Sequence, residues 1–483
     1  MARILDLSGL TFDDVLIVPA YSEVLPRDVD VHTRFSRGIE LAIPLISAAM
    51  DTVTEFGMAA TIAALGGIGV IHKNMTIHEQ VAQVLRVKSL GIPHIAPIIL
   101  ASGDQSIGEI ISAPNYEKAV GVVVVENEEY HFHPKSDLSA VRDQGKKLGS
   151  FQNWVHVVIN SELDVRLDQV SELNNHQDAV LLCRDSNHEI TGVFAPKHPY
   201  KNYHRATLSD SGTLRVAAAI GVTKDSIERG DALLAAGVDV LVIDTAHGHS
   251  AGVINTVKEM RKHYGSAQLV AGNIATTAAA EALSKTGVDG IKVGIGPGSI
   301  CTTRIVAGVG IPQLTAIMEV AKCAGPADMP VIADGGVRSS GDLAKALAAG
   351  SDAVMMGGIF AGTMESPGET LEKDGTMYKN YRGMGSIGAM IQGSKDRYFQ
   401  EAQSESKKLV AEGVEGYVPL QGSVKDIAFQ LIGGLKSSMG YCGAKDIPTF
   451  RNHAEFIQVT PASIQESHPH DLFYIKDAPN YKK

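Results

Sequence analysis

A short glycine-rich stretch, residues 294–304, carries the residue types most suited to covalent chemistry in this 483-residue chain. Its sequence is GIGPGSICTTR, and its three glycines, at positions 294, 296 and 298, free the backbone for bends that a β-carbon would forbid. Such a loop can direct several amides or carbonyls at one point, so it could hold an anion or a cation. Cys301 follows the glycines, and two threonine hydroxyls and the Arg304 guanidinium come directly after it. A thiol in these surroundings is a candidate nucleophile, because only the thiolate attacks and nearby donors or positive charge favour it. A buried cysteine in a tight turn is the alternative.

The other cysteines and the paired histidines indicate no second chemical centre. Cys183, Cys323 and Cys442 lie far apart in the chain without a C-x-x-C pair, so neither a disulfide framework nor a zinc knuckle is expected. Three pairs of histidines are separated by one residue, which on a strand would place both rings on one face. These pairs are His131 and His133, His247 and His249, and His468 and His470. None has an acidic or cysteine partner at a familiar metal-ligand spacing.

The overall composition is that of a soluble globular protein, with 44% hydrophobic and 20% charged residues. The net charge of −11 argues against general binding to nucleic acid or to an anionic membrane surface, although a local basic site is compatible with it. The first residues, MARILDLSGLTFDD, lack the charged-then-apolar layout of a signal peptide. No apolar run approaches the length of about 18 residues that a membrane span needs, and the final PNYKK matches no sorting tail. We therefore expect a cytoplasmic protein.

The strands and helices that must position Cys301 follow one rhythm in two separate sections. Within residues 1–91, two buried-strand candidates alternate with two helical patterns, and from residue 214 six further apolar runs follow with helical segments between them. The strand candidates are 43–50, 66–72, 214–221, 238–244, 268–273, 290–294, 330–336 and 352–358, and helical patterns include 56–65, 76–89, 226–236, 277–285 and 340–349. Eight buried parallel strands with intervening helices predict an α/β fold, the (β/α)₈ or TIM barrel.

Residues 92–203 interrupt this rhythm. Glycines become rarer, charged and amide residues increase, and the only tryptophan, Trp154, occurs here. Strand candidates such as 119–125 and 179–183 stand beside turn signals, which indicates a separate α+β insert with two similar halves. We therefore divide the chain into a first barrel part (1–91), an insert (92–203) and a second barrel part (204–483).

The predicted strand ends carry a set of polar residues and glycines. In barrels of this kind the active site lies at the carboxyl ends of the strands. The residues predicted there are Ser47, Met50, His72, Asp244, Asn273, the Cys301 loop, Asp334 with Gly335 and Gly336, and Gly357 with Gly358. The last two strands end in paired glycines, as expected for a phosphate pocket, and Asp334 is a natural acceptor for sugar hydroxyls. This convergence favours a functional Cys301 over the tight-turn alternative.

Six motifs, occurring in this order, resemble the inosine-5′-monophosphate (IMP) dehydrogenase / GMP reductase family. They are LTFDDVLIVPAYSEVLP (10–26), SAAMDTVTE (47–55), GGIGVIHKNM (66–75), GIGPGSICTTRIVAGVGIPQ (294–313), ADGGVRSSGD (333–342) and MESPGE (364–369). The resemblance covers residues 1–91 and about 205–483. Residues from about 386 to 420 resemble the mobile flap of the dehydrogenases, with an Arg-Tyr pair at Arg397 and Tyr398. Reductases lack that pair, since a dehydrogenase must hydrolyse its covalent intermediate whereas a reductase must exclude water.

The resemblance implies NAD-dependent oxidation of IMP to xanthosine-5′-monophosphate, a step of guanine nucleotide biosynthesis. Cys301 would attack C2 of the purine, and the adduct would pass a hydride to NAD⁺. The flap would then enter the vacated space, where Arg397, helped by Tyr398, would activate water. An arginine base is unusual because its pKa lies above about 12, so burial would have to lower it. Thr303 and Glu412 resemble the family's second proton path.

Two other functions are compatible with parts of this sequence. GMP reductase, which converts GMP to IMP with NADPH and releases ammonia, is the alternative enzyme. A catalytically silent nucleotide-sensing assembly protein is disfavoured, because the nucleophile, the flap pair and the cation-type loop occur together.

The resemblance also assigns binding residues. Asp334 would hold the ribose, Met384 and Gly385 would meet the base, and the phosphate would contact Gly336, Gly357, Gly358 and Tyr381; Met50, Ser299, Gly383 and Glu412 complete the substrate set. Asp244 and Asn273 would lie near the nicotinamide ribose, with Gly294 and Gly296 also facing NAD. The carbonyls of Gly296, Gly298 and Cys301 resemble a potassium site completed by Glu466, Ser467 and His468 of a neighbouring subunit. That arrangement implies a homotetramer, and pairing of tetramers into octamers is left open.

Two features depart from the dehydrogenase pattern. Gly358 stands where these enzymes commonly carry serine, which puts one phosphate hydrogen bond in doubt, and a glycine pair is also typical of the reductase. The insert occupies the place of the family's tandem CBS modules (a Bateman domain), but its GVFAPK segment, residues 192–197, lacks the usual threonine and the ribose-binding aspartate. Regulation by purine nucleotides at this CBS-like insert and a purely packing role both stay open.

Overall fold

The computed structural model divides into two compact units. It describes residues 2–91, 98–116, 119, 121–126, 129–135, 138, 141, 143–150, 156–159, 179–184, 190–194, 205–210, 212–400, 405, 408–473 and 478–481. The first unit comprises Met1–Lys88, His204–Ser209 and Leu214–Lys483, and the second comprises Ser89–Tyr203 and Asp210–Thr213.

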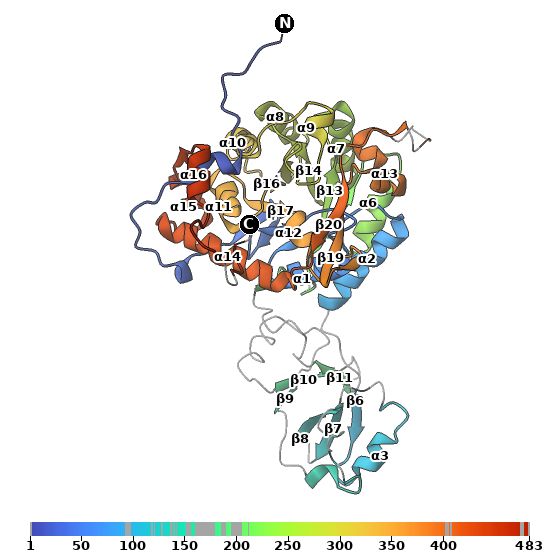
Figure 1. Ribbon diagram of the computed structural model, residues 1–483. Coiled ribbons are helices and arrows are strands. Elements are labelled where there is room, and N and C mark those ends of the chain that lie inside the picture. Colours follow the sequence, from blue (N-terminus) through green and yellow to red (C-terminus); the bar gives the residue numbers. More distant parts are fainter. Residues whose placement is uncertain are drawn as a thin grey trace. The chain divides into compact units, whose positions relative to one another are not determined.

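The first unit is built on a closed barrel of parallel strands with helices around it (Figure 1). Its strands are β4 (Leu45–Ser47), β5 (Ile68–Ile71), β12 (Ala217–Ile220), β13 (Val240–Asp244), β14 (Gln268–Ile274), β15 (Gly290–Val293), β16 (Val331–Asp334) and β17 (Ala353–Met356). They are hydrogen-bonded in the order β12-β13-β14-β15-β16-β17-β4-β5, and β5 pairs with β12 to close the ring. Seven of these eight strands fall within a predicted apolar run, and β14 extends one residue beyond its run, so the (β/α)₈ prediction is confirmed.

Helices connect the strands and cover the outside of the barrel (Figure 1). They are α1 (Phe56–Ala64), α2 (Ile77–Gly91), α6 (Ser226–Ala235), α7 (Ala251–Tyr264), α8 (Thr277–Ser284), α10 (Gln313–Ala324), α11 (Ser340–Ala348) and α14 (Val424–Tyr441). Several begin at a hydroxyl residue whose side-chain oxygen accepts a backbone N–H of the first turn, as Ser250, Thr276 and Ser339 do for α7, α8 and α11. Such capping satisfies donors that have no partner within the helix and so places each helix start directly after its strand.

Apolar side chains fill the barrel interior. Ile46, Val70, Val242 and Ile332 are fully buried in one cluster, which also contains residues of the hairpin β2 (Thr33–Ser36) and β3 (Ile39–Leu41). Because this apolar cluster occupies the interior, the polar residues that end the strands are left to form the walls of a cavity.

Several smaller elements surround the carboxyl ends of the strands. A three-stranded antiparallel sheet is formed by β18 (Thr370–Lys373), β19 (Thr376–Arg382) and β20 (Glu415–Pro419). The flap, which we define as residues 386–420, leaves this sheet after β19 and returns to it as β20. Its described part includes α13 (Ile387–Gln392) and the 3₁₀ helix η5 (Ser394–Tyr398). The remaining elements are η1 (Phe12–Asp14), β1 (Val15–Ile17), η2 (Pro26–Asp28), α9 (Thr303–Val306), α12 (Gly358–Ala361), α15 (Ile447–His453), β21 (Phe456–Gln458) and α16 (Pro461–Glu466).

The second unit contains two small sheets of the same topology. In one, β6 (Ile98–Ala101) runs parallel to β7 (Gly121–Glu126), which pairs antiparallel with β8 (Glu129–Pro134). In the other, β9 (His156–Ile159) runs parallel to β10 (Ala179–Arg184), which pairs antiparallel with β11 (Ile190–Phe194). The short helices α3 (Ile107–Ile111) and η3 (Leu148–Ser150) belong to the first half. Trp154 and residues 195–197 of the GVFAPK segment lie outside the described residues.

None of the helices in the described part of the chain combines the length and the apolar character that a membrane crossing requires.

Candidate active site at the carboxyl ends of the barrel strands

A cavity of about 1430 Å³ lies at the carboxyl ends of the strands. Its lining includes most of the residues that the sequence singled out, drawn from five strand ends, the glycine-rich loop, β19 and the residues after it, the flap and the segment after α16. These residues are Met50, Asp244, Asn273, Gly294, Gly296, Gly298, Ser299, Cys301, Thr303, Asp334, Gly336, Gly357, Gly358, Tyr381, Gly383, Met384, Arg397, Tyr398, Glu412, Ser467 and His468. Four of the expected residues, Ser47, His72, Gly385 and Glu466, are not part of this lining. Ser47 and His72 are buried in the protein, at 0% and 2% exposed, instead of facing the cavity.

Cys301 is only partly buried and faces this cavity. Its thiol lies 3.2 Å from the Thr303 hydroxyl, to which it can donate a hydrogen bond. The flap holds the loop from the other side, because the Thr302 N–H donates to the Glu412 carbonyl at 2.9 Å and the Val414 N–H donates to the Ile300 carbonyl at 3.0 Å. A thiol presented on a braced loop at the cavity wall is accessible to a bound ligand, whereas a cysteine in a packed turn would not be.

Arg304 braces the glycine-rich loop. Its guanidinium donates to the carbonyls of Ile295 and Ile311, at 3.2 and 2.6 Å. Burial lowers the pKa of the Arg304 guanidinium, and the nearby Cys301 side chain acts in the opposite direction. The sequence suggested that this guanidinium favours the thiolate, but its described hydrogen bonds go to backbone carbonyls, so its contribution is to hold the shape of the loop. Gly296, with φ +76°, is needed here, because a β-carbon would lie 2.6 Å from the Arg304 Cγ.

A buried lysine that the sequence analysis did not single out joins the strand ends. Lys292 on β15 is 1% exposed, and its Nζ lies 2.8 Å from Asp244 Oδ1 and 2.6 Å from Asp334 Oδ2. It also donates to the Asn273 side-chain carbonyl. The Asn273 amide in turn donates to Asp334 Oδ2 at 3.0 Å and to the Gly294 carbonyl at 2.7 Å. The signal in the sequence was a charged residue inside the buried run GIKVG, since a lysine there needs partners to be tolerated.

The flap places its Arg-Tyr pair inside the cavity. The Arg397 guanidinium forms an ion pair with Asp244, and the Ala246 N–H donates to the Arg397 carbonyl at 3.1 Å. Tyr398 is partly buried, and the loss of hydration raises the pKa of its phenol, opposed by the charge of Arg397. The aromatic ring packs on Gly385, where a β-carbon would lie 2.7 Å from Tyr398 Cζ. Asp244, expected beside the nicotinamide ribose, is thus the residue that receives the flap arginine in this structure.

A polar corner lies across the cavity where β17 enters α12. A β-carbon on Gly357 would lie 2.9 Å from the Tyr381 hydroxyl, and one on Gly358 would lie 3.4 Å from Ser299 Oγ. Burial raises the pKa of Tyr381 to about 12, and its hydrogen bond with Ser299 acts in the opposite direction. Tyr381 therefore keeps its proton at neutral pH and can donate it. Hydroxyls and helix-start amides at one corner are suited to a phosphate.

The residues expected at a cation site lie on two separate segments. Gly296 and Gly298 belong to the loop before Cys301, whose N–H donates to the Gly298 carbonyl at 3.1 Å. Glu466 and Ser467 lie at the end of α16, and His468 Nδ1 lies 3.0 Å from the Tyr481 hydroxyl. Within the described ranges, no group of three or more His, Cys, Asp or Glu side chains is arranged to hold a metal ion. Backbone carbonyls such as those of Gly296, Gly298 and Cys301 are the kind of oxygen that can replace the hydration shell of a monovalent cation.

Comparison with known proteins identifies the family. Residues 9–470 match the model of the IMP dehydrogenase / GMP reductase domain. The chain is 46% identical to an inosine-5′-monophosphate dehydrogenase of Chlorobaculum tepidum and 47% identical to that of Bacillus subtilis (strain 168), in each case over 98% of both chains. Among solved structures, it resembles a GMP reductase variant from Trypanosoma brucei in complex with guanosine 5′-monophosphate, with a TM-score of 0.77, 38% identity, and coverage of 96% of this chain and 98% of the other. The chain belongs to the IMP dehydrogenase / GMP reductase family.

Proposed function

We propose that this protein is an NAD-dependent IMP dehydrogenase, which converts IMP, NAD⁺ and water to xanthosine-5′-monophosphate, NADH and a proton. The observation that carries the proposal is the meeting of the Arg397-Tyr398 pair with Cys301 in one cavity. A reductase has to keep water away from its covalent intermediate, so a base for water beside the nucleophile favours the dehydrogenase. The relatives with 46% and 47% identity bear the dehydrogenase name, which supports the same choice.

In the first half-reaction, Cys301 would act as the nucleophile. Its sulfur would bond to C2 of the purine, and Thr303, 3.2 Å away, would accept the thiol proton and pass it on. Asp334 would orient the ribose, while the corner of Ser299 and Tyr381 would hold the phosphate. The carbon at C2 would then be tetrahedral and able to give up a hydride.

NAD supplies the hydride acceptor when it is bound. Asp244 and Asn273 face the cavity with a carboxylate and an amide, and these groups suit ribose hydroxyls. Lys292 keeps both in place, because its ammonium contacts each of them. Arg397 contacts Asp244 in this structure, so the flap and NAD would use this residue in turn.

In the second half-reaction, the flap would supply the groups that activate water. Arg397 in its neutral, deprotonated form would take a proton from water with the help of Tyr398, and the resulting hydroxide would attack C2 and release the Cys301 sulfur as a thiolate. Thr303 and Glu412 would form the second proton path. The backbone of Glu412 contacts Thr302, which keeps that residue beside the nucleophile loop.

We further propose a cation site, a homotetramer, nucleotide binding by the insert and a cellular location. A monovalent cation, K⁺, would bind the carbonyls of Gly296, Gly298 and Cys301, with Glu466, Ser467 and His468 contributed by a neighbouring copy in a homotetramer. Purine nucleotides would bind the CBS-like insert, residues 92–203. The enzyme would act in the cytoplasm, in guanine nucleotide biosynthesis.

Steady-state assays separate the dehydrogenase from the reductase. IMP with NAD⁺ should yield NADH and xanthosine-5′-monophosphate, and Cys301→Ala should abolish this activity. Mass spectrometry of protein quenched during turnover should find a purine adduct on Cys301. NADPH consumption with GMP and release of ammonia would instead establish the reductase.

A further inference from the structure

The loop after strand β5, residues 72–74, contacts the flap in two places, and neither contact takes part in the chemistry described above. In the first, Lys73 Nζ lies 2.5 Å from Asp396 Oδ1. The two side chains are 12% and 7% exposed, so this ion pair is nearly buried. Asp396 directly precedes Arg397, so the pair connects the barrel to the residue next to the proposed water-activating group.

The Asp396 carboxylate enters a space that a glycine leaves open. Gly221 follows β12, and a β-carbon built there would lie 2.3 Å from Asp396 Oδ2 and 3.3 Å from Lys73 Cε. Every residue other than glycine would therefore collide with the docked carboxylate. Backbone conformation does not require glycine at position 221, because Gly221 does not have a positive φ. The space taken by the Asp396 carboxylate does require it.

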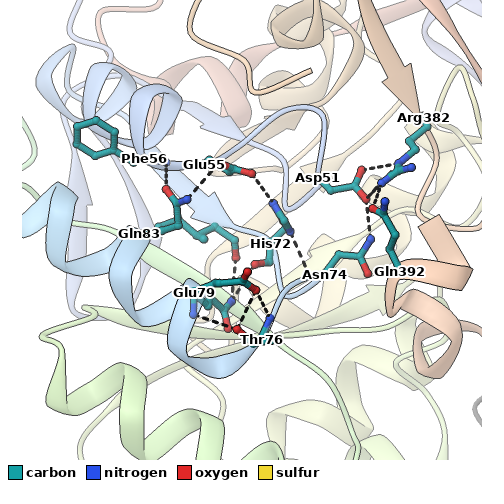
Figure 2. Close-up of polar contacts among 12 residues, drawn as sticks. Asp51, Glu55, Phe56, His72, Asn74, Thr76, Glu79, Gln83, Arg382 and Gln392 are labelled. Carbon is teal, nitrogen blue, oxygen red and sulfur yellow. Dashed lines mark hydrogen bonds and ion pairs between the residues drawn. The ribbon is translucent and has the colours of Figure 1, made fainter. Parts of the chain in front are cut away.

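The second contact lies at the base of the flap (Figure 2). The Asn74 amide donates to Asp51 Oδ2 at 2.6 Å and to the Ala389 carbonyl of α13 at 3.3 Å. Arg382 binds both oxygens of Asp51 and also donates to Gln392, the last residue of α13. This contact fixes where the flap starts, while Lys73 contacts it a few residues further on, at Asp396, directly before Arg397.

Buried hydrogen bonds hold the loop that carries Lys73. The Asn74 N–H donates to His72 Nδ1 at 3.1 Å, so the ring proton is on Nε2, which lies 3.4 Å from a Glu55 carboxylate oxygen (Figure 2). The fully buried Gln80 amide donates to the His72 carbonyl at 3.1 Å and to the Ala219 carbonyl of β12 at 2.8 Å. Lys73 is thus presented from a rigid part of the barrel, and the flap is the partner that can leave.

We propose that Lys73 is a positioning residue that holds the flap on the barrel during hydrolysis, by pairing with Asp396 and so keeping Arg397 on Asp244. The inference rests on the proposed dehydrogenase function. A nearly buried ion pair gains Coulomb attraction but loses the hydration of both charges, so its net strength is small. A weak pair suits a contact that must form and break in every turnover. Without Lys73, Asp396 would be buried with no counter-charge, and the docked flap would be disfavoured.

The test separates the two half-reactions in a stopped-flow experiment with IMP and NAD⁺. We expect Lys73→Met and Asp396→Asn to form NADH in the first turnover at a rate within about twofold of the wild type. We expect their steady-state rate to fall at least about tenfold, because hydrolysis needs the docked flap. The purine adduct on Cys301 should accumulate, as measured by mass spectrometry of quenched samples. Excess NAD⁺ should inhibit these variants at lower concentrations, since the flap competes less well for Asp244.

A matched control comes from an ion pair of the same length and burial elsewhere in the barrel. Lys88 Nζ lies 2.5 Å from Asp239 Oδ2, with side chains 12% and 11% exposed, and neither residue touches the flap. Lys88→Met should lower the melting temperature but leave the ratio of the first-turnover rate to the steady-state rate unchanged. A steady-state rate that falls as much in Lys88→Met as in Lys73→Met would overturn the inference.

Gly221→Ala tests the same idea without removing a charge, and it serves if Lys73→Met fails to fold. Its β-carbon would block the docked carboxylate while leaving the undocked flap unaffected, so it should also slow hydrolysis and spare NADH formation. Hydrolysis at the wild-type rate in both Gly221→Ala and Asp396→Asn would refute the role of Lys73 but not the proposed function. Equal losses of NADH formation and of hydrolysis in these variants would refute it as well. A wild-type enzyme that makes no NADH from IMP would instead refute the proposed function, and the inference with it.

Discussion

Gly358→Ser tests the assignment of the polar corner to the substrate phosphate. Gly358 is the first residue of α12, and it stands where the dehydrogenases commonly carry serine. A β-carbon there would lie 3.4 Å from Ser299 Oγ and 3.6 Å from Tyr381 Cε1, which are ordinary van der Waals distances. The backbone does not have a positive φ at this position, so serine should fit without strain. Its hydroxyl would join those of Ser299 and Tyr381 in facing the bound anion.

The serine hydroxyl adds one hydrogen-bond donor to the phosphate, and this should raise the affinity for IMP. A hydrogen bond to a charged group contributes about 1.5–3 kcal/mol, and each 1.4 kcal/mol or so corresponds to a tenfold change in affinity. Serine also loses some rotamer freedom on binding, so the lower part of this range applies. We therefore expect the Kd for IMP to fall by about tenfold. Gly358→Ala is the matched control, because it fills the same space without the hydroxyl and should give no gain.

Calorimetric titration of IMP can measure this difference. Both variants are made in a Cys301→Ala background, so that no covalent step follows binding. Inosine, which lacks the phosphate, is titrated alongside. The reasoning is refuted if the serine and alanine variants bind IMP equally well, or if serine improves inosine binding as much as IMP binding.

Two further predictions concern buried groups. Lys292→Met leaves Asp244 and Asp334 without their common counter-ion, and breaking a buried pair in this way costs about 3–5 kcal/mol. Urea unfolding followed by circular dichroism should show this loss of unfolding free energy. Lys292→Arg keeps the charge and should lose less. Tyr381 has a pKa raised to about 12 by burial, so the folded state keeps this proton after the unfolded chain has lost it. The contribution of Tyr381 to the free energy of unfolding is therefore complete below about pH 10. As the pH rises toward about 12, up to about 3 kcal/mol of it is lost. Tyr381→Phe should flatten the decline of unfolding free energy over that range, and an unchanged slope would contradict the assignment.

Much of the barrel could be predicted because the signals for it are local. A parallel strand buried on both faces reads as a short apolar run, and the glycines and acidic residues after each run mark where the strand ends. For example, the run at 290–294 contains β15 (Gly290–Val293), and the pattern at 340–349 contains α11 (Ser340–Ala348). Because all strands of such a barrel point the same way, knowing the strand ends was enough to predict most of the residues that surround the cavity. Ser47 and His72 are exceptions, since both are buried and do not line it.

The sequence was less informative about charged side chains, whose partners come from distant segments. Arg304 stands three residues after Cys301, yet its guanidinium turns to the carbonyls of Ile295 and Ile311. Lys292 sits in an apolar run, and nothing local reveals that Asp244 and Asp334 converge on it. Side-chain direction depends on what the neighbouring strands place nearby, and this cannot be read from one segment.

The sequence by itself determined the barrel, its rim of candidate residues and, through its motifs, the family. Only the tertiary structure decided which of those residues meet. It placed Arg397 on Asp244 and paired Lys73 with Asp396, which are 323 positions apart. The physical reason is that strand formation responds to the hydrophobicity of a few consecutive residues. An ion pair instead requires two segments to be brought together and its charges to be shielded from water, and both follow from closing the barrel and docking the flap.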